Sequence, residues 1–243
     1  MSELPSVDVL LGWVRDADRR LASVLASLDD AAVREPSLLP GWTRGHVLTH
    51  IARNADGLAN LLTWARTGVE TPMYASREAR NADIEAGAGR GVDEQRQDVE
   101  QAAARFFAAV EALEPGQWNA SVKTLTSPLL PASQVPWMRA REMWVHVVDV
   151  DAGVGPADWP DDVARTLFAD AAATMSERVA EPVALRIAGA DGPPVALGPA
   201  GGGMPLEVEG AVPSLTAWLI GRSPGRDLHV NGGGTAPRLP AWI

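Results

Sequence analysis

Cysteine is absent from this chain of 243 residues, and lysine occurs only once, at Lys123. Without cysteine the protein can form no disulfide, offer no thiolate to a metal ion and use no thiol of its own as a nucleophile. Any sulfur chemistry at this protein must therefore use a thiol that is supplied from outside.

Positive charge is scarce as well, and it is not clustered. The formal net charge is −10, and the 21 basic residues, all arginine except Lys123, form no basic block. Such a chain is a poor partner for a phosphate backbone or an anionic membrane surface, so we expect no binding to nucleic acids or membranes. The N-terminus lacks a basic and apolar leader, and no apolar run has the length of a membrane span. We therefore expect a cytoplasmic protein.

Hydrophobic periodicity predicts helices in the first part of the chain. With 46% hydrophobic and 21% charged residues, the composition is that of a globular protein with a sizeable core. Apolar residues recur at spacings of three and four in four long segments, as in amphipathic helices. These segments span residues 7–28, 43–64, 93–113 and 133–150. Four such helices predict a bundle over about the first 150 residues.

The remaining segments follow other patterns. Residues 67–92 form a long polar connection, and its length indicates a function beyond a simple turn. After Gly155 we expect short strands and helices, with Asp191-Gly192 as a hairpin signal. Helices are predicted over 160–179 and 211–220, strands over 183–187, 195–197, 206–209 and 228–230, and an irregular tail over 237–243. The expected fold is a helical bundle over residues 1–155 and a smaller α+β domain over residues 156–243.

Three residues on two of the predicted helices are candidate metal ligands. Glu142 and His146 are four residues apart, so they share one face of a helix. His50 lies among apolar residues of another helix, and facing helices of a bundle can bring ligands together in the core. Three histidine or carboxylate ligands leave a coordination position open for chemistry, whereas structural zinc usually takes four protein ligands. The pattern makes His50, Glu142 and His146 candidate ligands for zinc.

The residues alone leave alternatives open. A carboxylate four residues from a histidine also arises by chance, and His46 is a rival to His50 as a ligand. Because His46 falls in the first turn of its helix, we expect it to be a supporting or solvent-facing residue. Asp149 is expected to close its helix or to orient a ligand histidine. Arg80 and Arg222 are candidate clamps for anions, although a solvated surface arginine is the commoner role.

Several short motifs give the chain a resemblance to a known family. They are Pro40 to Arg44 leading to His50, Glu70 to Tyr74, Ala79 to Asn81, Trp137 to Asp149, Gly221-Arg222 and Pro240 to Ile243. Together they resemble the mycothiol-dependent maleylpyruvate isomerases of the wider DinB-like metalloenzyme group. The resemblance implies a DinB-like four-helix bundle joined to a C-terminal α+β domain similar to sterol-carrier folds. It also implies zinc on His50, Glu142 and His146, and catalytic roles for Arg222 and Arg80.

The reaction implied by the resemblance is the cis-to-trans isomerisation of 3-maleylpyruvate to 3-fumarylpyruvate in gentisate degradation. Mycothiol thiolate would add to the alkene, rotation would occur about the resulting single bond, and elimination would release the trans product. The implied partners are a dicarboxylate substrate and a low-molecular-weight thiol. Two rivals remain: another mycothiol-dependent zinc enzyme such as an S-transferase, and a nonenzymatic zinc-binding regulatory module.

Overall fold

The computed structural model describes residues 4–125, 127–199 and 203–242. Ile243, the last residue of the predicted tail, lies outside the described residues. The chain divides into two compact units, one formed by Pro5–Val154 and the other by Gly155–Ile243 with Met1–Leu4. The first unit is helical, and the second combines helices with a mixed sheet, which confirms the predicted fold class.

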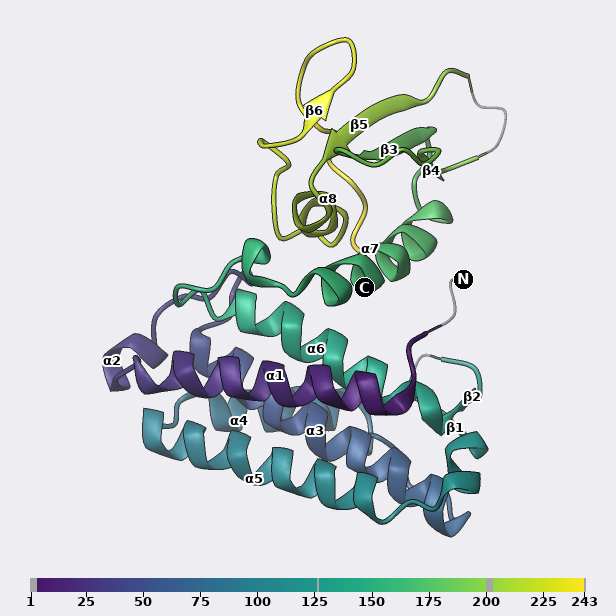
Figure 1. The fold of residues 1–243 in the computed structure, drawn as a ribbon. Helices are drawn as coiled ribbons and strands as arrows, with labels where there is room; N and C mark the ends of the chain where they lie inside the picture. Colours follow the sequence, from purple (N-terminus) through teal and green to yellow (C-terminus); the bar gives the residue numbers. More distant parts are fainter. Residues whose placement is uncertain (1–3, 126, 200–202, 243) are drawn as a thin grey trace. The chain divides into compact units, whose positions relative to one another are not determined.

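Four long helices form the bundle of the first unit (Figure 1). They are α1 (Val7–Ala26), α3 (Arg44–Thr67), α5 (Val92–Glu111) and α6 (Val135–Asp149). Both α1 and α3 pack against α5 and against α6, so the four helices close around one core. The apolar stripe of α1, from Leu10 through Val14 and Leu21 to Leu25, is buried as its spacing predicts. The four predicted helices are confirmed.

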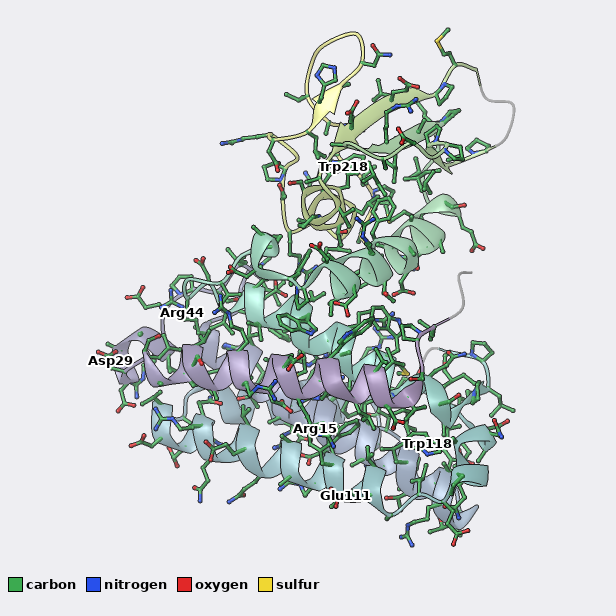
Figure 2. All side chains as sticks on the ribbon, viewed as in Figure 1. Arg15, Asp29, Arg44, Glu111, Trp118 and Trp218 are labelled. Carbon is green, nitrogen blue, oxygen red and sulfur yellow. The ribbon has the colours of Figure 1, made fainter. Side chains whose placement is uncertain are left out.

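Local sequence signals explain where two of these helices begin. Thr43 caps α3, since its side chain accepts from the backbone N–H of His46. Pro136 lies in the first turn of α6, where its missing N–H costs no helical hydrogen bond. The side chain of Arg44 reaches the end of α6 and donates to the carbonyls of Val150 and Asp151, at 2.9 and 2.8 Å (Figure 2).

The polar connection over residues 67–92 contains a helix that the sequence did not predict. The segment contains α4 (Arg77–Ala88), in which only Ile84, Gly87 and Ala88 are buried. With so few buried residues, the helix has no apolar stripe for periodicity to detect. The sequence also did not predict α2 (Asp30–Val33), the pair β1 (Ser121–Val122) and β2 (Leu130–Pro131), or the 3-10 turns η1 (Pro115–Asn119), η2 (Ala132–Gln134) and η3 (Pro156–Asp158). These elements are too short for a repeat to develop.

Two glycines allow α4 to lie very close to α3. A Cβ atom at Gly45 would stand 2.2 Å from the carbonyl oxygen of Ala88, and one at Gly87 would stand 2.4 Å from Cγ2 of Thr49. The buried amide of Gln95, on α5, donates to the carbonyls of both glycines, at 3.3 and 2.8 Å. The close packing of α3 and α4 therefore depends on residues that lack side chains.

The second unit is built on a four-stranded sheet of order β4-β3-β5-β6. Its strands are β3 (Val183–Ile187), β4 (Val195–Leu197), β5 (Leu206–Gly210) and β6 (His229–Val230), and its helices are α7 (Asp161–Ser176) and α8 (Val212–Leu219). β3 pairs antiparallel with β4, as the Asp191-Gly192 signal predicts, and parallel with β5. The two helices pack on each other, α8 contacts β3 and β5, and α7 contacts β4. No described helix is long and apolar enough to cross a membrane.

Candidate metal centre

The structure brings His50, Glu142 and His146 together in the core of the bundle. Nε2 of His50 lies 3.0 Å from Oε2 of Glu142 and 3.0 Å from Nε2 of His146. One ligand atom from each of the three residues lies within 4.8 Å of the other two. Among the described residues, no other group of three or more histidine, aspartate or glutamate side chains has such an arrangement.

Helices α3 and α6 set the position of these side chains. Glu142 and His146 lie one turn apart on α6, with 3.4 Å between Oε2 and Nε2. Arg139, one turn before Glu142, is buried and donates from Nη1 to the carbonyl of Ile51 and to Oδ1 of Asn54, at 2.8 and 3.0 Å. These bonds join α6 to the part of α3 that carries His50. They hold the two helices in the register that makes the ligand atoms converge.

The electrostatics of the cluster suit a cation. Burial, followed by the charge of His146, lowers the pKa of His50 to about 4, so its imidazole is neutral at neutral pH. Burial acts to raise the pKa of Glu142, but hydrogen bonds from His146 and His50 hold that pKa well below its ordinary value. A neutral imidazole and an ionised carboxylate are the protonation states that metal coordination requires.

Asp149 contacts the His146 ring at Nδ1, the nitrogen that does not face His50 and Glu142. It is fully buried, and its Oδ2 lies 2.8 Å from Nδ1 of His146. Burial acts to lower the pKa of His146, but the hydrogen bonds with Asp149 and Glu142 raise it. With its Nδ1 proton donated to Asp149, His146 would offer Nε2 to a metal ion that takes the place of the proton shared with Glu142. This pairing of carboxylate and imidazole recurs at metal sites, where it orients the ligand and increases its basicity. The donor set therefore fits a metal ion such as zinc.

Replacing Asp149 by asparagine is expected to weaken zinc binding by about 10- to 100-fold, the usual cost of losing a partner of this kind. The neutral amide of Asp149→Asn is a weaker acceptor for the Nδ1 proton of His146, so it orients the imidazole less firmly and increases its basicity less. Competition with a chromogenic chelator measures the affinity. Asp151→Asn makes the same change at an exposed position two residues away and should leave the affinity unchanged. Equal affinities in the two variants would contradict the role of Asp149.

His46 does not join the cluster. Its Nδ1 accepts from the backbone N–H of Thr43 at 3.1 Å, so His46 completes the cap of α3. Its Nε2 lies 3.4 Å from Oε2 of Glu85, and its ring stacks on Trp42 with 6.0 Å between centroids. The first-turn position of His46 thus gives it a capping role, which the sequence did not indicate.

Arg80 lies directly beside the cluster. It is half-buried on α4, and its Nη2 stands 3.0 Å from Nδ1 of His50. A guanidinium has donors only, so this ring nitrogen accepts the hydrogen bond. Arg80 thus places a positive charge next to the candidate ligands, as an anion clamp requires.

Arg222 lies in the second unit and lines a cavity of about 710 Å³ there. Its Nη1 donates to the carbonyl of Ile220 at 2.9 Å. The C-terminal tail forms part of the cavity wall. It is held by hydrogen bonds from Trp218 to the carbonyl of Pro237 at 2.9 Å and from Arg178 to the carbonyl of Ala241 at 2.7 Å. Sequence reasoning found Arg222 but missed Arg178, whose partners are backbone carbonyls more than sixty residues away.

These features first define a class: a helical-bundle protein with a candidate metal centre of two histidines and one glutamate, followed by an α+β unit. The particular family follows from the sequence. The chain belongs to the mycothiol maleylpyruvate isomerase family, because the sequence model of that family's N-terminal domain matches residues 14–151.

Solved structures agree with this assignment. The crystal structure of the mycothiol-dependent maleylpyruvate isomerase is similar over 98% of both chains, with a TM-score of 0.89 and 33% sequence identity. A histidine-to-alanine mutant of that enzyme gives the same values. No curated protein sequence gives a significant match.

Proposed function

We propose that this protein is a zinc-dependent isomerase that uses mycothiol to convert 3-maleylpyruvate to 3-fumarylpyruvate, a step of gentisate degradation. The observation that carries the proposal is the convergence of His50, Glu142 and His146 in a chain similar over 98% of its length to an enzyme with this activity. The absence of cysteine is consistent with an imported thiol as the nucleophile.

Each group has a distinct task in this proposal. The thiol supplies reversible addition to the double bond, which turns it into a single bond that can rotate. A bound zinc ion supplies Lewis acidity toward the thiol or toward the substrate's oxygens. Asp149 keeps the His146 ring oriented toward that ion. Arg222 and Arg80 bind the carboxylates of the substrate and offset the negative charge that develops on it.

We also propose that residues 1–155 and 156–243 are separate domains with complementary tasks. The first would hold the metal and Arg80, and the second would supply Arg222. The two compact units of the chain support this division.

The proposal is tested by following the ultraviolet absorbance of maleylpyruvate with purified, zinc-loaded protein. Loss of the cis isomer is expected only when mycothiol is present. Chelation of the metal should abolish turnover, and added zinc should restore it. Formation of fumarylpyruvate is confirmed by chromatography.

Two other outcomes would replace the proposal. Consumption of mycothiol with formation of a stable thioether would identify an S-transferase. Zinc binding with no turnover of maleylpyruvate, with or without mycothiol, would identify a nonenzymatic zinc-binding module.

A further inference from the structure

Tyr74 is the only tyrosine of the chain, and a glycine on α3 makes room for it. A Cβ atom at Gly57 would lie 2.7 Å from Cγ of Met73, 2.9 Å from its carbonyl oxygen and 3.2 Å from Cε1 of Tyr74. Gly57 follows His50 by seven residues, which is about two turns of helix, so both lie on one face of α3. The segment of Met73 and Tyr74 therefore packs onto the face of α3 that carries the candidate ligand.

Arg80 connects Tyr74 to the metal centre. Its guanidinium contacts Nδ1 of His50 at 3.0 Å, and its Cζ stands 5.8 Å from the centroid of the Tyr74 ring. The guanidinium is close enough to the phenol to act against the rise in the pKa of Tyr74 that burial causes. The phenol and the guanidinium thus form adjacent donors beside the cluster.

The environment of Tyr74 keeps its hydroxyl protonated. Burial raises the pKa of Tyr74 above its ordinary value, and the negative charge of Glu142 acts in the same direction, while the charge of Arg80 opposes both. A phenol with a raised pKa remains a hydrogen-bond donor at neutral pH. A neutral donor next to a cationic donor is suited to an oxygen that becomes negatively charged during a reaction.

We infer that Tyr74 is a further catalytic residue, whose hydroxyl donates a hydrogen bond to the substrate oxygen that gains negative charge. The inference rests on the proposed function. When the C–S bond forms, the π pair of the alkene moves through the conjugated system onto a carbonyl oxygen, where Tyr74 and Arg80 stabilise it. After rotation the pair returns, the double bond forms again, and the C–S bond breaks with its electrons on sulfur. Tyr74 keeps its proton throughout.

The test is Tyr74→Phe, which removes one oxygen atom and keeps the ring that packs near Gly57. We expect kcat to fall by about 100-fold, the usual cost of losing one donor to a developing oxyanion. Zinc content and the KM for mycothiol should be unchanged, because the ring and the metal ligands are intact. Wild-type kcat in Tyr74→Phe would overturn the inference, and so would loss of zinc, because either result would give Tyr74 a structural role at most.

A second variant tests the placement of Tyr74 independently. Gly57→Ala retains the hydroxyl but crowds Met73 and Tyr74, so kcat should fall while zinc content is retained. Unchanged kcat would contradict the argument that this glycine positions the phenol.

A binding measurement separates failure of this inference from failure of the proposed function. If zinc-loaded wild-type protein does not isomerise maleylpyruvate, the proposed function fails, and the role of Tyr74 is then measured by calorimetric binding of maleate. Loss of one hydrogen bond to a carboxylate should weaken maleate binding by about tenfold or more in Tyr74→Phe. Equal binding of maleate to both proteins would overturn the role of Tyr74 as an anion donor.

Discussion

Alanine at His50, Glu142 or His146 is expected to abolish stoichiometric zinc binding while the bundle stays folded. Each substitution leaves two protein ligands where three converge within 4.8 Å. The loss of affinity should exceed the roughly 100-fold that marks the upper end for an outer-shell partner. Metal analysis after dialysis and chelator competition measure the effect, and circular dichroism monitors the helices.

His46→Ala is the matched control for this series. The residue lies one turn before His50 on the same helix, yet its Nδ1 caps α3. The variant should lose some stability and keep its zinc. Retention of full zinc by His50→Ala, or its loss from His46→Ala, would overturn the assignment of ligands.

Arg222→Lys is expected to reduce kcat by as much as about 10³-fold with no change in zinc content. Lysine keeps the positive charge but loses the planar fork that binds a carboxylate at two points. The expected size is that of losing a preorganised donor to developing charge. Steady-state kinetics with zinc-loaded protein, together with metal analysis, measures both quantities.

Arg226→Lys controls for the loss of an arginine nearby. Arg226 is exposed and does not line the cavity that contains Arg222. The Arg226→Lys variant should retain wild-type kcat. Near-normal turnover in Arg222→Lys would reduce Arg222 to a surface residue and remove it from the mechanism.

Much of the fold could be predicted because its main elements carry a local signal. Helices α1, α3, α5 and α6 each present a buried stripe, and Thr43 and Pro136 mark two of their beginnings. Helix α4 could not be predicted in this way, because few of its residues are buried. Its place depends on Gly45 and Gly87, whose contacts come from segments distant in the sequence.

The site was predictable to the extent that its members are polar residues in apolar surroundings. His50, Glu142 and His146 stand out on that basis, and their convergence is observed, while their role as zinc ligands stays a prediction. Arg139 was not predictable as the link between the helices, because its partners are a backbone carbonyl and an amide on another helix. Tyr74 lies in one of the motifs of the resemblance, but only the fold places it beside Arg80.

The contact between Arg80 and His50 would couple the binding of a metal ion to the binding of an anion. While Arg80 donates to Nδ1, a neutral His50 carries its proton on Nε2, the nitrogen that faces Glu142. A metal bound through Nε2 would exclude this tautomer and would free Arg80 to bind a carboxylate of the proposed substrate. Such coupling is reciprocal. If the metal increases the affinity for a dicarboxylate by some factor, the dicarboxylate increases the affinity for the metal by the same factor. On the proposed function, we therefore expect the bundle to bind zinc more tightly when a dicarboxylate is present.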